Sequence, residues 1–233
     1  MRQTAQETLH LQAKARCVGM AGITTVLSYP APGQADVWLA DVSHLARIGL
    51  KGPAAAAWLQ ARNIDVPARA NTWQELAAGS DHWSVIARLG NSEFLLEEDG
   101  DAPLIAQLTT QLQTEISGVY PIPREDSEFV LGGALAADAL TEVCNIDFAS
   151  PKARAGNAIL TLMAGVAVLV IAQFDGARRR YRIWCDPSFG AYLWTTLSDV
   201  IAHHSGAILG LEQLAAPPRL PSTTERIALG ENS

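Results

Sequence analysis

The side chains with the greatest chemical potential in this 233-residue chain are Asp41, Ser43 and His44, which lie within four positions of one another. Carboxylate, hydroxyl and imidazole are the groups of a hydrolytic triad, but a triad is defined by the spatial roles of its members. The consecutive Asp-Val-Ser-His run also lacks the Gly-x-Ser-x-Gly turn that exposes a nucleophile. We therefore expect Asp41 and Ser43 to bind backbone groups where a strand bends.

Two further pairs of residues belong to types found in binding sites. His203 and His204 could bind a metal, but adjacent residues on a helix point about 100° apart, and no third ligand stands at a useful spacing. Gly132-Gly133 is the nearest approach to a phosphate-binding loop, although neither G-x-G-x-x-G nor the P-loop pattern occurs. We interpret the glycine pair as a tight turn from a strand into a helix.

One acidic group completes the candidates, and we expect it to be the solvated end of a hairpin: Glu97, Glu98, Asp99 and Asp101. None of these patterns combines a nucleophile, a base and a third group at useful spacing. The sequence therefore predicts no catalytic, cofactor-binding or metal-binding residue on this chain.

Composition predicts a cytoplasmic globular protein. The 17 basic and 24 acidic residues give a formal net charge of −7, and no basic face stands out, which argues against a nucleic-acid partner. The three cysteines are far apart and form no CxxC, so we expect reduced thiols without a disulfide framework. The N-terminus has no apolar run after its first charges, so we expect no secretory signal and no membrane association.

The stretch around which the rest of the chain is organised is 158–174, which contains no charged residue. A membrane-spanning helix needs about 20 apolar residues. The β-branched residues and the Asp175-Gly176 turn favour two buried strands instead, at 158–163 and 166–173. A third strand at 179–185 alternates between two faces, which is typical of a half-covered sheet.

The helix after these strands has the clearest signals in the sequence. Asp186 is suited to the N-cap and Pro187 to the first helical position. Apolar residues then recur at spacings of four and three as far as Val200, and Gly206 suits the C-terminal end. We expect this helix to pack on the three strands.

The remaining pattern repeats in the two halves of the chain. We expect strands at 22–28, 37–50, 83–89, 93–97 and 128–131, and helices at 53–62, 103–113 and 134–143. This order predicts an α+β fold made of duplicated strand-helix-strand-strand units with mixed or antiparallel sheets. The expected divisions are an extended arm at 1–20, subdomains at 21–120 and 121–210, and a proline-rich tail at 211–233.

Two sets of segments resemble known families. DVSHLARIGLKGPAAAAWLQ, residues 41–60, resembles folate-binding aminomethyltransferases of the glycine cleavage T-protein superfamily, where an Asp-x-Ser strand leads into a helix opened by Gly-Pro. VYPIPREDSEFVLGGALAADAL, CNIDF and PSFGAYLWTTL, in this order, resemble the gamma subunit of heterotetrameric sarcosine oxidase and related N-methyl amino acid oxidases and dehydrogenases. The chain lacks the Asn-x-Gly-x-x-x-Lys-Asp segment that aminomethyltransferases use.

This resemblance implies a non-catalytic structural subunit with a T-protein-like fold. It further implies alpha and beta flavoprotein subunits and a small delta subunit as partners. FAD, FMN, NAD and tetrahydrofolate would be carried by those other subunits. Such complexes oxidatively demethylate sarcosine or another N-methyl amino acid, such as N-methylglutamate.

Two alternatives stay open. The chain could be a stand-alone folate-dependent aminomethyltransferase-like protein, for which Asp41 is the candidate to hold the pterin, or a binding module of the same fold in another complex. For the subunit interpretation, the candidate docking residues form a basic cluster and part of the tail: Arg178, Arg179, Arg180, Pro217, Pro218 and Pro221.

Overall fold

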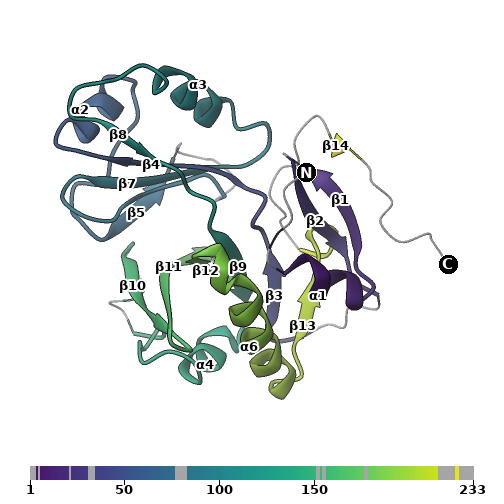
Figure 1. The fold of residues 1–233 in the computed structure, drawn as a ribbon. Helices are drawn as coiled ribbons and strands as arrows, with labels where there is room; N and C mark the ends of the chain where they lie inside the picture. Colours follow the sequence, from purple (N-terminus) through teal and green to yellow (C-terminus); the bar gives the residue numbers. More distant parts are fainter. Residues whose placement is uncertain are drawn as a thin grey trace.

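The computed structural model describes residue 4 and residues 6–20, 22–30, 35–76, 83–150, 153, 156–175, 178–214 and 224–225. Within these residues the chain forms a six-stranded, a five-stranded and a three-stranded sheet. Two larger α+β units, each built on one of the two larger sheets, lie one above the other, and the three-stranded sheet lies beside them (Figure 1).

The upper unit in Figure 1 follows the order strand, helix, three strands, helix. Its elements are β4 (Ala46–Lys51), α2 (Ala55–Gln60), β5 (Thr72–Glu75), β6 (Val85–Arg88), β7 (Glu93–Glu98) and α3 (Pro103–Gln111). Strand β8 (Tyr120–Ile122) completes the antiparallel order β5-β6-β7-β4-β8. Leu50, Leu59, Phe94 and Leu108 are among the buried residues that join the helices to the sheet.

The lower unit repeats this order. Its elements are β9 (Ser127–Gly132), α4 (Ala136–Thr141), β10 (Ala158–Met163), β11 (Val166–Asp175), β12 (Arg178–Cys185), the short 3-10 turn η1 (Pro187–Phe189) and α6 (Gly190–His203). The sheet order is β10-β11-β12-β9-β3-β13, where β3 is Trp38–Asp41 and β13 is Ala207–Leu209. The predicted strands 158–163 and 166–173 and the Asp186 cap, which accepts from the Ser188 N–H, are confirmed.

The two units exchange strands. β3 leads into β4 along the chain but pairs with β9 of the other unit, whereas β8 leads into β9 but pairs with β4. The order β5-β6-β7-β4 therefore matches β10-β11-β12-β9, and each unit borrows its next strand from the segment preceding the other unit. The matching orders confirm the predicted duplication in an α+β fold. The six-stranded sheet is mixed, as predicted, because β13 joins β3 in parallel.

Glycines at equivalent positions make the exchange possible. Gly52 follows β4 with φ +131°, and a Cβ there would lie 2.2 Å from the Gly118 carbonyl oxygen. Gly133 follows β9 with φ +111°, and a Cβ there would lie 2.2 Å from the Asp36 carbonyl oxygen. Gly118 and Asp36 each stand two residues before an exchanged strand, β8 and β3. At positions 52 and 133, only glycine allows both the positive φ and this close approach of the chain. Gly132-Gly133 is a strand-to-helix turn, as predicted.

The N-terminal segment is not an extended arm. Residues 6–20 contain α1 (Glu7–Gln12) and β1 (Arg16–Met20), which pairs with β2 (Ile23–Ser28). Glu7 and His10 of α1 are buried. The inward face of this helix is polar, so the apolar period that indicates a helix in a sequence is absent. Of the expected tail beyond residue 214, the structure describes only β14 (Thr224–Glu225), which pairs with β1.

Three strand predictions need correction. The single strand expected at 37–50 is two strands, β3 and β4, in different sheets, and β5 was not predicted. β12 is covered on both faces rather than one, because Arg182 and Trp184 are as buried as Tyr181. The apolar run at 158–174 lies in β10 and β11, and no helix in the described part of the chain is long and apolar enough to cross a membrane.

Candidate functional site

A buried polar network lies where α1 meets the loop between β3 and β4. Asp41 Oδ1 accepts from the Ser43 hydroxyl at 2.6 Å and from the Ser43 N–H at 2.9 Å. Its other oxygen lies 2.6 Å from Gln6 Nε2 and 2.8 Å from His10 Nε2. The hydroxyl of Ser43 accepts from the Glu128 N–H at 2.9 Å, so this network fastens β3 to β9. Asp41 and Ser43 bind backbone groups at a bend, as predicted.

The histidine that pairs with Asp41 is His10, not the neighbouring His44. His10 Nδ1 lies 2.7 Å from the hydroxyl of half-buried Tyr29, which gives a Tyr–His–Asp chain. Burial acts to raise the pKa of Asp41, but hydrogen bonds from His10, Ser43 and Gln6 hold it below its ordinary value. Sequence reasoning missed His10 because it lies in a segment without periodicity, 31 positions before Asp41.

His44 is buried without a hydrogen-bond partner for either ring nitrogen among the described residues. Burial lowers the pKa of His44 to about 4, and the nearby charge of Arg47 adds to this effect while Asp41 opposes it. The imidazole is therefore neutral at physiological pH. No triad forms at Asp41, Ser43 and His44, in agreement with the sequence.

A second buried cluster fills the space between the two larger sheets. Arg47 of β4 donates to Glu97 of β7 at 2.7 Å and to Glu128 of β9 at 2.8 Å. Arg182 of β12 donates to Glu128 at 2.7 Å and pairs with Glu97. Trp184 Nε1 also donates to Glu97 at 3.0 Å. Two guanidinium groups and two carboxyl groups thus form a closed ring of ion pairs and hydrogen bonds.

Two members of this ring are related by the duplication. Arg47 and Glu128 stand at equivalent positions, each five residues before the glycine that follows its strand (52 − 47 and 133 − 128). Burial raises the pKa of the Glu128 carboxyl, and the charge of Arg47 opposes that rise. Buried charges of this kind persist only when they are paired and hydrogen-bonded, which is the case for each member here.

The prediction that four acidic residues form the solvated end of a hairpin is wrong for two of them. Glu97 and Asp99 are buried, Glu97 in the ring described above and Asp99 as the acceptor of the Ser84 hydroxyl at 3.0 Å. Only Asp101 of the four is fully exposed, and Glu98 is half-buried. The partners of Glu97 come from β4 and β12, so its local sequence contains no sign of them.

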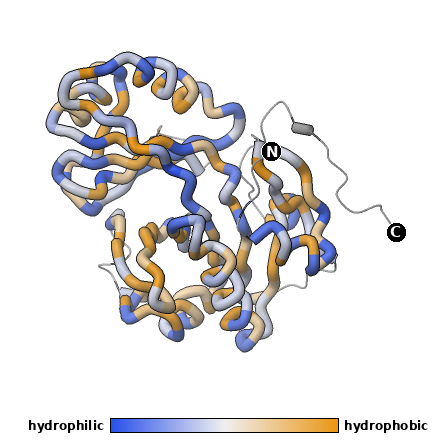
Figure 2. The backbone as a smooth tube through the Cα atoms, viewed as in Figure 1, coloured by the Kyte–Doolittle hydropathy of each residue, from blue (hydrophilic) through white to orange (hydrophobic). Residues whose placement is uncertain are grey.

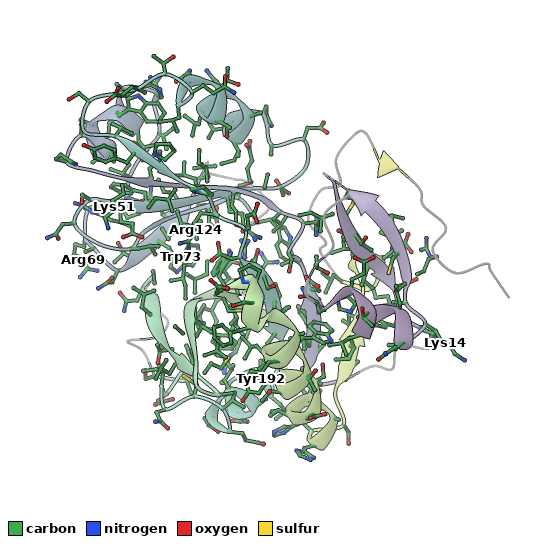
Figure 3. All side chains as sticks on the ribbon, in the orientation of Figure 1. Lys14, Lys51, Arg69, Trp73, Arg124 and Tyr192 are labelled. Atoms are coloured by element: carbon green, nitrogen blue, oxygen red, sulfur yellow. The ribbon has the colours of Figure 1, made fainter. Side chains whose placement is uncertain are left out.

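An open groove of about 270 Å³ lies between the two units on one side of this cluster. Leu160, Ala167 and Leu169 of β10 and β11 line one wall, with Trp184 behind them. The β6–β7 hairpin forms the opposite wall, which includes Glu93. The other charged residues of the lining are Arg124, Asp126 and Asp186. Figure 3 shows Arg124 in this region, between the upper and the lower sheet.

The three predicted docking residues that the structure describes lie away from this groove. Arg178, Arg179 and Arg180 begin β12, at the end of the β11–β12 hairpin opposite to the groove. The guanidinium of Arg180 stacks over the Trp83 ring, 4.4 Å from its centroid, and so contacts its own chain. Pro217, Pro218 and Pro221 lie outside the described residues. Their role in docking stays a prediction.

Comparison with solved structures shows which fold this arrangement represents. The chain is similar to aminomethyltransferase T of the glycine cleavage system from Bartonella henselae, with a TM-score of 0.66 and 18% identity over 91% of this chain and 60% of that one. It is also similar to a chain of heterotetrameric sarcosine oxidase from Corynebacterium sp. U-96, with a TM-score of 0.63 and 24% identity over 88% of this chain and 97% of that one. No protein-family model and no curated protein matches the sequence.

The chain therefore has the fold of glycine cleavage T-proteins, which a chain of heterotetrameric sarcosine oxidase shares. The predicted fold class and the predicted structural resemblance are confirmed. The match spans 60% of the aminomethyltransferase chain, whereas the sarcosine oxidase chain and this chain are of nearly equal length and overlap almost throughout.

Proposed function

We propose that this chain is a non-catalytic structural subunit of a heterotetrameric, sarcosine oxidase-like flavoenzyme that oxidatively demethylates sarcosine or another N-methyl amino acid. The observation that carries the proposal is the overlap with a sarcosine oxidase chain over 97% of that chain and 88% of this one. The alpha and beta flavoprotein subunits and a small delta subunit would be its partners, in the cytoplasm. FAD, FMN, NAD and tetrahydrofolate would belong to those other subunits.

The geometry between the units supports a structural role. The space between the two large sheets is filled by the paired side chains of Arg47, Glu97, Glu128 and Arg182. All four side chains are at most 2% exposed. Groups that already neutralise and hydrogen-bond one another have no spare capacity to polarise a substrate, so they support a rigid body rather than a reaction site.

The test is to isolate the tagged chain from its native cells and to record the absorbance spectrum of what co-purifies. The proposal predicts a stoichiometric yellow complex with two larger chains and one small chain, which oxidises an N-methyl amino acid. A colourless, solitary protein would overturn the proposal.

A stand-alone folate-dependent aminomethyltransferase-like protein is the second candidate, favoured by the match to the aminomethyltransferase fold over 91% of this chain. Asp41, the residue that would hold the pterin, is buried and engaged by Gln6, His10 and Ser43. Its carboxylate is therefore already satisfied. Tetrahydrofolate binding by the isolated chain in titration calorimetry would support this candidate, and no heat at high micromolar ligand would exclude it.

A further inference from the structure

Exposed apolar side chains gather around the β10–β11 hairpin. Leu160 and Leu162 of β10 are 59% and 61% exposed. Phe189 and Tyr192 are 50% and 54% exposed and follow β12, whose end, Cys185, pairs with Val168 at the start of β11. Tyr192 also reaches the hairpin turn directly, because its hydroxyl donates to the Ala164 carbonyl at 3.1 Å. Only two other large hydrophobic side chains are exposed in the described part of the chain, Leu11 and Tyr120.

Strand β10 is also an edge strand. Among the described residues, its outer edge is paired only at its two ends, where the Ala158 N–H donates to the Asn71 carbonyl at 2.9 Å and Met163 forms a bridge with Cys144. β10 is the first strand of the six-stranded sheet, and its sequence, AILTLM, contains neither a charge nor a proline. Natural proteins protect exposed sheet edges with charged residues, with proline or by covering them, because an apolar edge pairs with other chains. The tube of β10 and β11 is largely coloured as hydrophobic in Figure 2. An edge of this composition is therefore suited to being covered in an assembly.

The groove beside this edge has a negative charge. Of its four charged residues, Arg124 Nε lies 3.1 Å from Asp126 Oδ2, so these two neutralise each other. Glu93 and Asp186 remain as two carboxylates in the lining. Asp186 accepts hydrogen bonds from Ser188, and neither carboxylate forms an ion pair within the described part of the chain. An apolar wall beside two carboxylates complements an apolar segment that carries a lysine or an arginine.

We propose that the β10–β11 hairpin and the adjoining groove form the docking surface for a larger partner chain of the complex. That chain would present an apolar segment against Leu160 and Leu162 and a basic side chain toward Glu93 and Asp186. This inference rests on the proposed function, since it takes the partner from the same complex. A second copy of this chain is a poor occupant, because a two-fold contact brings the same carboxylates toward one another.

The decisive experiment compares tagged variants expressed in native cells. L160S/L162S makes the two exposed leucines polar. We expect the amount of the larger flavin-containing chains that co-purifies to fall at least about tenfold, because apolar anchors dominate interface energetics. Leu11→Ser and Tyr120→Ser are matched controls that change exposed apolar residues elsewhere, and they should retain wild-type amounts. Equal retention by L160S/L162S and wild type would overturn the docking surface while leaving the proposed function intact.

The charge component is tested separately. E93Q/D186N removes both carboxylates and keeps a helix cap, because asparagine serves as an N-cap as well as aspartate does. We expect weaker retention of the larger chains at low salt and little difference from wild type at high salt. Retention that is insensitive to this change at every salt concentration would refute a basic partner segment.

Hydrogen exchange gives a readout that does not depend on variants. In the purified complex, amides of residues 158–169 should exchange more slowly than in the isolated chain, while those of β1 and β2 serve as an internal reference. Unchanged exchange at 158–169 in an intact yellow complex would overturn the docking surface alone. If the wild-type chain retains no larger chain, the docking surface and the proposed function both fall.

Discussion

His44 couples the stability of this protein to pH through a single buried side chain. Its folded pKa, about 4, lies below the ordinary value of 6.5, so the unfolded chain binds a proton more readily than the folded chain does. Stability is therefore present in full above pH 6.5 and is lost as the pH falls toward 4. The two pKa values differ by about 2.5 pH units, so protonation of this histidine lowers the unfolding free energy by up to about 3 kcal/mol.

We expect His44→Leu to flatten the fall of the unfolding free energy between pH 6.5 and 4. Urea denaturation at a series of pH values measures this effect. His203→Gln, which replaces an exposed histidine at the end of α6, is the control and should keep the wild-type slope. An unchanged slope in His44→Leu would mean that other groups cause the acid sensitivity.

The buried ring predicts a non-additive response to mutation. Arg182→Met leaves Glu97 and Glu128 facing each other with one guanidinium between them, and we expect a loss of about 3–5 kcal/mol in unfolding free energy. Adding Glu97→Gln removes one of the orphaned charges, so the double variant should be more stable than Arg182→Met alone. Thermal unfolding of the four proteins of this cycle measures the coupling, and strictly additive losses would contradict a charge ring.

At the scale of elements, the turns at Gly52 and Gly133 should be the least tolerant of a methyl group. Gly133→Ala meets both a positive φ and the Asp36 carbonyl, whereas Gly165 has a positive φ of 83° with nothing within 4 Å of its Cβ position. We expect Gly165→Ala to cost about 1 kcal/mol from backbone strain alone. Gly133→Ala should cost about 1–3 kcal/mol more, because it also presses on the exchanged strand. Denaturant midpoints of the two variants decide between these effects.

The elements that the sequence predicts best are those whose signals are local. Strands β10 and β11 and the start of the last helix were predicted because alternation, the turn and the Asp186-Pro187 cap are all contained in a few residues. The strand exchange was not predictable in the same way, since β3 finds its partner β9 almost ninety residues later.

The candidate sites were predicted less well for the same reason. Asp41 and Ser43 were assigned correctly to backbone contacts two residues apart. His10 and Glu97 were missed as buried groups, because a charged or polar residue looks like a surface residue until its partner on a distant strand is known. Both lie in buried networks whose members come from distant segments of the chain.

At the scale of the whole molecule, the exchange couples the two units in their stability. Removing either unit would leave β3 or β8 without the strand that it pairs with. We expect a single cooperative unfolding transition with equal calorimetric and van't Hoff enthalpies. Two resolved transitions in a scanning calorimeter would show that the units unfold separately in spite of their shared strands.

The same exchange has a consequence for synthesis. On the ribosome, Asp41 of β3 is made 88 residues before its partner Phe129 (129 − 41), so β3 waits for much of translation without its neighbour. Leu39, which packs in the core with Phe129 and Leu131 of β9, stays uncovered by them during this interval, when a nascent chain is prone to wrong association. A chain stalled before residue 132 would carry that strand uncovered, and would present chaperones and proteases with a target that the completed protein conceals.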